Sequence, residues 1–367
     1  MKLVAPLPIV LVGAGWRTRE FYSPLLCEAL AARLKVVGVV SRSEERARSL
    51  ADELGVPWSL DLSDSVVWGA RGAVVAVSPD QNHTVASGLV HLGVPALLET
   101  PLALSLDDAR DLLQVIEGSG LPFEIAEQNP RHLGPRMWKE VIDRGLLGEV
   151  RLVGSGGAGY RYHATAVARS LFGRRRGLTA IGMREFTNID LGRGVDREPL
   201  YVGAVAVAGG GLFQIRAAEP FYSQDSGWSP QGWSILGDLG GLSATNELSL
   251  AAPGGATRHP LEWLPGGGSG GNAVRGIRIG GKEGLEIETA LPDFDSSDDL
   301  QAVGRCLLDW LARLEGTESP TGWSARDAFC DLAWIDAVER SATLGGARMR
   351  VSAPPSAPPR PSGEGRV

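Results

Sequence analysis

The chain has 367 residues, of which 43% are hydrophobic and 22% are charged, and its formal net charge is −7. This length is sufficient for two domains with cores of their own, and the composition is typical of soluble globular proteins. The acidic balance argues against a nucleic-acid partner, which would need a concentrated basic face, because Arg174–Arg176 is the only basic cluster.

The first third of the chain alternates strand patterns with helix patterns. Apolar runs typical of buried strands lie at residues 8–13, 35–40, 72–77, 95–98 and 122–126. Helical patterns lie between them at about 19–33, 43–54, 81–92 and 105–118. Alternation of this kind predicts a parallel, doubly wound sheet that binds its ligand at the carboxyl ends of the strands.

After residue 126 the pattern changes. One helix is predicted at 135–145, and strands follow at 200–207, 211–218, 233–238, 241–250 and 274–287, with closing helices at about 298–315 and 324–343. We therefore predict three segments: a dinucleotide-binding α/β domain (1–127), an α+β substrate domain with a mostly antiparallel sheet (128–345), and a Pro-rich, disordered tail (352–367). The ligand cleft is expected between the two domains.

The first strand runs directly into a glycine turn. Gly13 and Gly15 stand one residue apart, and Trp16, Arg17 and Thr18 follow. Glycines permit the tight turn, and the next helix offers free N–H groups and a positive dipole end to a pyrophosphate. Thr18 stands where a third glycine would complete the dinucleotide fingerprint. We predict that these five residues bind the cofactor. A bare glycine turn, with Trp16 partly buried in the core, is the alternative.

The second strand ends at Ser41 and Arg42. An acidic residue at position 41 would bind a ribose 2′-hydroxyl, whereas a hydroxyl and a guanidinium suit a 2′-phosphate. These residues therefore favour NADP over NAD as the cofactor. The alternative is that Arg42 pairs with Glu44 or Glu45 on the helix surface, which would contribute little.

Further candidates for the cofactor site follow the later strands of the sheet. Ser78 and His83 come after the third predicted strand (72–77), Glu99 and Thr100 after the fourth (95–98), and Gln128 after the fifth (122–126). The carboxyl ends of parallel strands meet at one edge, so these side chains are expected near the cofactor. Thr100 would bind the substrate or the nicotinamide ribose. Its alternative role is merely to end the strand.

The three cysteines, Cys27, Cys306 and Cys330, have no spacing for a metal site or a disulfide, so we expect them buried and reduced and expect no metal. The apolar start, up to residue 12, is too short for a signal peptide or a membrane span. We therefore expect a cytoplasmic protein without a membrane partner.

Four segments in this order resemble the glucose–fructose oxidoreductase / inositol dehydrogenase (Gfo/Idh/MocA) family. They are Val12–Arg17, Gly93–Ala103, Glu127–Val150 and Tyr162–Gly173. The resemblance implies a Rossmann domain followed by an open-faced sheet domain, which often mediates homo-oligomerisation as a dimer or tetramer. It also implies reversible hydride transfer between a nicotinamide cofactor and a sugar, a cyclitol or a related small carbonyl compound.

The resemblance places His163 as the catalytic proton relay, since an imidazole titrates near neutral pH. Tyr162 flanks it and would donate a phenolic hydrogen bond, or simply pack beneath the cleft. Two positions depart from the family. Thr100 replaces the family's lysine, a cationic proton donor, and Ala166 replaces an aspartate that would orient the imidazole.

These residues lead to two functional hypotheses. The first is an NADP-dependent oxidoreductase acting on a sugar-like or other small carbonyl or imine substrate in a specialised biosynthetic pathway. The second is a nucleotide-binding relative that has lost hydride transfer and performs non-redox chemistry or sensing. In the second domain, Phe221–Trp228 and Trp233 would stack on a sugar or pack within the sheet, and Arg161, Arg169 and Arg184 would meet an anionic substrate.

Overall fold

The computed structural model describes residues 5–155, 160–190, 195–218, 232–243, 247–267, 272–280, 284–317 and 319–356. They form two compact units. The first contains the chain up to Gln128, together with Ala290–Phe329 and the segment from Pro354. The second contains Asn129–Thr289 and Cys330–Ala353.

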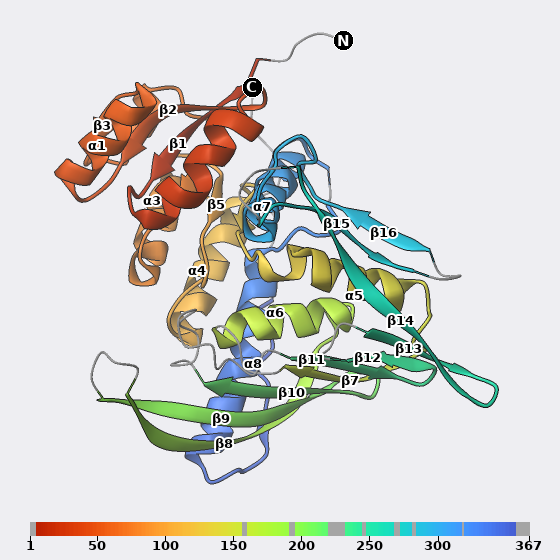
Figure 1. Cartoon of the computed structure of the whole chain (residues 1–367). Helices are drawn as coiled ribbons and strands as arrows, with labels where there is room; N and C mark the ends of the chain where they lie inside the picture. Colours follow the sequence, from red (N-terminus) through yellow and green to blue (C-terminus); the bar gives the residue numbers. More distant parts are fainter. Residues whose placement is uncertain are drawn as a thin grey trace. The chain divides into compact units, whose positions relative to one another are not determined.

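The first unit is built on a sheet with the strand order β3-β2-β1-β4-β5-β6, and every neighbouring pair is parallel (Figure 1). The strands are β1 (Leu7–Val12), β2 (Leu34–Val40), β3 (Trp58–Ser59), β4 (Ala73–Val75), β5 (Ala96–Leu98) and β6 (Glu124–Ile125). The chain winds outward from β1 in one direction and from β4 in the other. Ligands bind at such a reversal of strand order. The predicted doubly wound parallel sheet is therefore confirmed.

The helices of this unit follow the predicted positions, except for the short α2, which was not predicted. They are η1 (Thr18–Tyr22), η2 (Leu25–Ala29), α1 (Glu44–Leu54), α2 (Asp64–Val67), η3 (Pro79–Gln81), α3 (Asn82–His91), α4 (Leu106–Ser119) and α7 (Asp298–Leu314). The first two are π-helical turns inside one continuous helix that starts at Trp16. Ser43 and Ser105 cap α1 and α4 with their hydroxyls, as expected for these N-terminal residues.

The core of the first unit includes a helix from far along the sequence. Trp310 of α7 is fully buried and packs with Ile9, Leu11 and Leu25. The sequence-based division assigned α7 to the domain of residues 128–345, whereas its apolar face packs in the first unit. An amphipathic pattern shows that a helix has a buried face, but it does not reveal which core that face covers.

The second unit contains a sheet of eleven described strands in the order β16-β15-β14-β13-β12-β11-β7-β10-β9-β8-β17. They are β7 (Val150–Ser155), β8 (Gly177–Asp190), β9 (Val195–Val207), β10 (Gly211–Ala218), β11 (Trp233–Gly237), β12 (Gly240–Leu242), β13 (Glu247–Ala252), β14 (Gly255–Pro265), β15 (Val274–Ile279), β16 (Leu285–Glu288) and β17 (Met349–Arg350). Only the β7–β10 pair is parallel among these neighbours. The predicted, mostly antiparallel sheet is confirmed. Strands β8 and β14 and the short strand β17 were not predicted.

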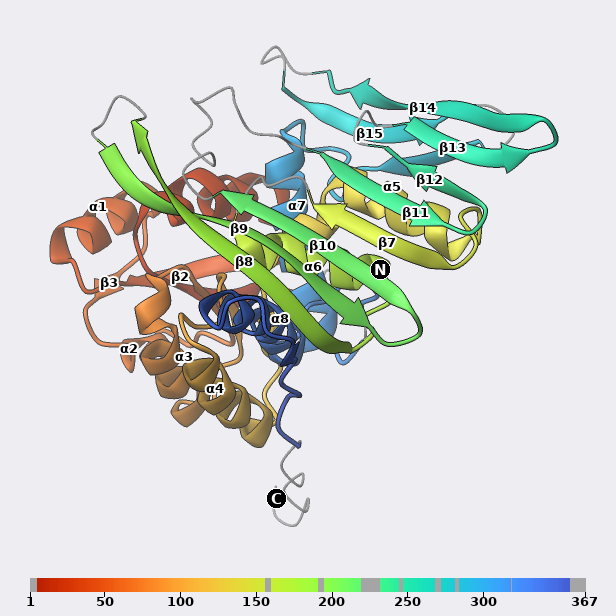
Figure 2. The ribbon, with the colours of Figure 1, turned by 90° about the horizontal axis from the view of Figure 1, so that it is seen from below.

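Helices cover one face of this sheet. They are η4 (Asn129–Arg131), α5 (Leu133–Asp143), α6 (Arg161–Leu171) and α8 (Ala325–Thr343), of which the residues from Cys330 belong to this unit. Figure 2 shows β8, β9 and β10 side by side with α8 next to β8. Val338 of α8 packs so closely that a Cβ at Gly182 or Gly203 would clash with it.

The opposite face of the sheet is open and apolar. Its exposed side chains are 42–69% accessible and come from neighbouring strands: Ile181, Met183, Val202, Leu212 and Leu236. This agrees with the open-faced sheet that the family resemblance implied.

The cysteines and the C-terminal tail differ in part from the predictions. Cys27 is exposed, contrary to the expectation of a buried thiol, whereas Cys306 is buried. The described part of the tail, residues 352–356, is held in place because Arg326 donates to the carbonyl of Pro355 at 2.9 Å. The rest of the tail lies outside the described residues. No helix in the described ranges is long and apolar enough to cross a membrane.

Candidate functional site

The glycine turn after β1 has the geometry of a phosphate cradle. Gly13 has a φ of +102°, and a Cβ there would lie 2.2 Å from the carbonyl oxygen of Ala76 at the end of β4. Only glycine fits this position. At Gly15 a Cβ would meet nothing within 4 Å, so the backbone is open to a ligand on that side. The carbonyl of Gly15 accepts the first helical hydrogen bond from the backbone N of Arg19 (3.2 Å). The N–H groups just before Arg19 therefore have no partner within the helix.

Thr18 supports this turn from inside. It is only 1% exposed, and its hydroxyl donates to the carbonyl oxygen of Gly13 at 2.8 Å. The residue that replaces the third glycine therefore stabilises the turn. Thr18 was predicted to bind the cofactor, and the structure shows its hydroxyl engaged by the backbone of Gly13.

Arg17 joins three strand ends into one hydrogen-bonded network. Its Nε donates to Glu99 Oε1 at 2.6 Å, and its Nη2 donates to Gln128 Oε1. Glu99 also accepts from the hydroxyl of Tyr22 at 2.7 Å and from the backbone N of Thr100 at 3.1 Å. The structure thus brings together Arg17, Glu99 and Gln128, which were predicted independently from the turn and the ends of β5 and β6.

The charges of this network are largely removed from solvent. Glu99 is 7% exposed, and the side chain of Arg17 is 24% exposed. Burial lowers the pKa of Arg17, but the charge of Glu99 and the neighbouring Tyr22 raise it, so the net pKa is raised. Burial, and then the negative charge of Glu99, raise the pKa of Tyr22 well above its ordinary value, which keeps it a protonated donor. With three donors on its carboxylate, Glu99 holds Arg17 in place.

Trp16 is not a core residue. Its side chain is 67% exposed, and its ring contacts the edge of Phe21 with a centroid distance of 5.3 Å. The guanidinium of Arg17 lies over the ring of Phe21, 4.1 Å from its centroid. A large apolar ring therefore stands in solvent beside Gly15, where it is available to a ligand.

The end of β2 presents Arg42 to solvent. Arg42 is exposed and Ser41 is half-buried, with the Ser41 hydroxyl accepting from the backbone N of Ser43 at 3.4 Å. Glu44, one of the two partners considered for Arg42, is paired with Arg48 at 2.7 Å. This pairing argues against Glu44 as the partner of Arg42.

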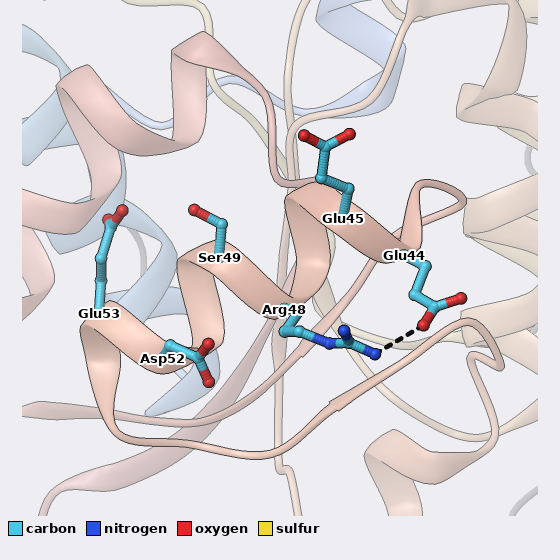
Figure 3. A pocket seen from close by; sticks show the side chains of 6 residues that line it. All are labelled: Glu44, Glu45, Arg48, Ser49, Asp52 and Glu53. Atoms are coloured by element: carbon cyan, nitrogen blue, oxygen red, sulfur yellow. Dashed lines mark hydrogen bonds and ion pairs between the residues drawn. The ribbon is translucent and has the colours of Figure 1, made fainter.

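Beside it, α1 carries an acidic surface groove. Its volume is about 620 Å³, and Figure 3 shows its lining side chains on successive turns of the helix: Glu44, Glu45, Arg48, Ser49, Asp52 and Glu53. Carboxylates outnumber the single arginine, so this groove repels phosphate groups. We therefore do not assign the nucleotide to it.

The loop after β5 is tied to α3 by a residue that the sequence analysis missed. Asn82 is 1% exposed, and its amide donates to the carbonyl oxygens of Glu99 (3.2 Å) and Pro101 (2.8 Å). The Thr100–Pro101 peptide is cis. Thr100 is partly exposed, and its hydroxyl has no hydrogen-bond partner within the described part of the chain. His83, in the first turn of α3, is also partly exposed.

Ser78 starts the η3 turn rather than reaching into a ligand site. Its side chain hydrogen bonds the carboxylate of Asp80, and this bond is the main cause that lowers the pKa of Asp80.

His163 and Tyr162 lie in the second unit, within the first turn of α6. The rings of these two residues are 4.3 Å apart, and Tyr160 stacks on Tyr162 at 5.5 Å with an interplanar angle of 7°. The backbone N of His163 donates to the carbonyl of Tyr160 at 3.0 Å. Ala166, where the family has an aspartate, is fully buried. The rings of both tyrosines also contact the imidazole of His163, at tilted angles.

Other candidates in the second unit have structural roles. Arg169 is buried and pairs with Asp331 at 2.7 Å, so it does not meet an anionic substrate as expected. The guanidinium of Arg161 lies 4.2 Å from the centroid of Tyr201. Trp233 packs against Trp138 at 5.7 Å, as in the packing alternative.

Arg184, on β8, is half-buried. The aromatic stretch Phe221–Trp228 lies outside the described residues.

Comparison with known proteins gives a family and a set of relatives. The model of the oxidoreductase family with an NAD-binding Rossmann fold (GFO_IDH_MocA) matches residues 7–126. An uncharacterized protein of Saccharomyces cerevisiae is 27% identical over 128 residues, or 34% of this chain and 36% of that protein. A protein of Amycolatopsis mediterranei, provisionally named a UDP-kanosamine synthase oxidoreductase subunit, is 34% identical over 110 residues, or 30% of each chain. The chain thus aligns with about a third of the length of these curated relatives.

Solved structures are similar over nearly the whole chain. The crystal structure of an oxidoreductase from Agrobacterium radiobacter, in complex with NAD+, L-tartaric acid and magnesium, superposes with a TM-score of 0.69 at 18% identity. The superposition covers 94% of this chain and 98% of that one. Likeness at this identity shows the fold, and the family model matches the segment that carries the glycine turn. The first unit therefore matches the Gfo/Idh/MocA oxidoreductase family, whose model describes an NAD-binding Rossmann fold, over residues 7–126.

Proposed function

We propose that the chain is an NADP-dependent oxidoreductase that transfers a hydride between the nicotinamide and a sugar-like or other small carbonyl or imine substrate. The observation that carries this proposal is the glycine cradle of Gly13 and Gly15, with Arg17 held beside it by Glu99 and Gln128. These residues fit a dinucleotide, because the backbone is open at Gly15 and the following helix start has unpaired N–H groups.

Each part of the cofactor has a group in the first unit that suits it. The pyrophosphate would be held by the N–H groups after Gly15, and the 2′-phosphate by the Ser41 hydroxyl and the Arg42 guanidinium. The exposed ring of Trp16 would pack on the dinucleotide. When bound, the nicotinamide supplies or accepts the hydride.

The proton must be handled by the chain itself. We assign this role to His163, whose imidazole would give a proton to, or take one from, the substrate oxygen or nitrogen. The ring of Tyr162 contacts the imidazole at 4.3 Å between ring centroids, whereas the buried Ala166 cannot orient it as the family's aspartate would. The hydroxyl of Thr100 would donate a hydrogen bond to the substrate in place of the cationic lysine.

The substrate class and the pathway are supported by a relative. The provisional name of the Amycolatopsis mediterranei protein, a UDP-kanosamine synthase oxidoreductase subunit, supports a sugar-like substrate in a specialised biosynthetic pathway. The open apolar sheet face, with Met183 69% exposed and Val202 50% exposed, supports a homo-oligomer, whose subunit count would be measured by light scattering.

A second function is favoured by Thr100 and the buried Ala166, because both positions lack the family's ionisable groups. In that case the chain would keep the nucleotide but perform non-redox chemistry or sensing. One experiment separates the two functions. NADPH is titrated into the protein by fluorescence, and its oxidation is then followed with a panel of keto sugars and imines. Substrate-dependent oxidation supports the redox proposal, whereas tight NADPH binding without oxidation by any panel member contradicts it.

A further inference from the structure

The second unit carries a basic cavity that none of the cofactor residues lines. Its volume is about 750 Å³, within the range of small-molecule sites. It lies where the start of β8, the short strand β17 and the last turn of α8 meet (Figure 2 shows β8 and α8). Its polar lining consists of Arg176, Arg340, Arg350, Thr179 and Ser352, and no carboxylate takes part. Positive charge is therefore concentrated here in a chain whose net charge is −7.

The walls of the cavity are fixed by hydrogen bonds. Arg350 of β17 is paired with Thr179 of β8 in an antiparallel register, which sets the two side chains next to each other. Ser341, buried at the end of α8, accepts from the backbone N of Gly182 at 2.9 Å and donates to the carbonyl of Ala347 at 2.6 Å. The helix end and both strands are thus held together before any ligand arrives.

The floor of the cavity is equally well defined. A Cβ at Gly177 would lie 2.6 Å from Nε1 of Trp334, so the start of β8 rests directly on this indole. Trp334 is 2% exposed and belongs to the core of the unit. Because the start of β8 is packed on this buried side chain, it keeps its position when the surface side chains of the cavity move.

The three arginines differ in how they are engaged. Arg340 is paired with Asp336 on the same helix at 3.2 Å, which partly neutralises it and limits its rotamers. No ion pair within the described ranges engages Arg176 or Arg350, and both are exposed. Two guanidiniums are therefore ready for an anion, with a third beside them. The planar fork of a guanidinium matches the oxygens of a phosphate group.

We propose that this cavity binds a small phosphorylated molecule, through Arg176 and Arg350 with Arg340 in support. The volume accommodates a sugar phosphate or a nucleotide, and the chemistry that the cavity recognises is the phosphate group common to both. The site is separate from the proposed cofactor residues. The residues that line the cavity belong to the second unit, whereas Gly13, Gly15 and Arg42 belong to the first.

The test is isothermal titration calorimetry on the full chain with its cofactor site saturated by NADPH. The probes are inorganic pyrophosphate, glucose 6-phosphate and ADP. The variants are Arg350→Ala, Arg176→Ala and the double variant, and the matched control is Arg348→Ala. Arg348 is also exposed and lies two residues from Arg350, but it does not line the cavity. Circular dichroism confirms that each variant is folded.

We expect at least one probe to bind the wild-type chain. Its affinity should fall about tenfold in each single variant, fall further in the double variant, and stay unchanged in Arg348→Ala. Absence of binding by all three probes would overturn the proposal, as would equal losses in Arg350→Ala and Arg348→Ala. NADPH affinity, measured on the same samples, should be the same in every variant. A failure of the redox proposal would leave this result unaffected.

Discussion

The network around Glu99 makes a quantitative prediction. Replacing Glu99 with Gln removes the negative charge that faces Arg17 Nε at 2.6 Å. It also replaces one acceptor oxygen of the carboxylate with an amide NH2 group, which is a donor. Breaking a buried ion pair in this way destabilises proteins by about 3–5 kcal/mol. Because the Arg17 side chain keeps 24% of its exposure, water recovers part of this loss, and we expect about 3 kcal/mol.

The surface pair of Arg19 and Glu53 provides a matched control. Its contact distance is also short, at 2.5 Å, but the Glu53 side chain is 57% exposed. Glu53→Gln should therefore lower the free energy of unfolding by less than about 1 kcal/mol. The two substitutions make the same chemical change, so the difference between them isolates the effect of burial.

Urea unfolding followed by circular dichroism measures both variants. The midpoint of the first unit should fall by about 1 M or more in Glu99→Gln and hardly change in Glu53→Gln. NADPH affinity should also decrease in Glu99→Gln, because Arg17 is no longer fixed beside the glycine turn. A loss in Glu99→Gln no larger than that in Glu53→Gln would refute the reasoning.

Four other predictions follow from the same geometry. Gly13→Ala should destabilise the first unit by about 3 kcal/mol or more in urea unfolding, whereas Gly15→Ala should cost less than about 1 kcal/mol yet weaken NADPH binding in a fluorescence titration. Arg42→Ala should weaken NADPH about tenfold or more and leave NADH unchanged, and equal losses would show that the 2′-phosphate is not bound there. His163→Ala should lower kcat about 100-fold or more with NADPH affinity intact, and an unchanged rate would remove it from the mechanism. Since the folded-state pKa of Tyr22 is raised, its contribution to stability is complete below its unfolded pKa of about 10 and is lost as the pH rises above it. Alkaline urea unfolding should show a smaller pH dependence in Tyr22→Phe.

The sequence predicted the first unit well because its signals are local. Buried parallel strands appear as apolar runs, and the glycine turn appears as Gly13 and Gly15 directly after one of them. The positions of Glu99 and Gln128 at strand ends were also correct. Their partner was not foreseen, because nothing in the sequence shows that the Arg17 side chain reaches both residues. Tyr22 and Asn82 were missed for the same reason.

The second unit was harder to predict. Strand β14 has mostly exposed side chains on both faces, so its sequence lacks the alternation that marks a half-buried strand. The basic cavity could be predicted only in part. Arg176 belongs to the basic cluster that the sequence shows, but Arg350 is far from it in the sequence and meets it only through the pairing of β17 with β8. Such sites arise from topology, which composition and spacing do not encode.

The central claim is that the pyrophosphate of a nicotinamide dinucleotide rests on the turn between β1 and its helix. A crystal structure of the chain grown with NADPH tests it most directly. We expect phosphate oxygens within hydrogen-bond distance of the backbone N–H groups of Gly15, Trp16 or Arg17. Density for the nucleotide at any other place, with this turn left empty, would contradict it.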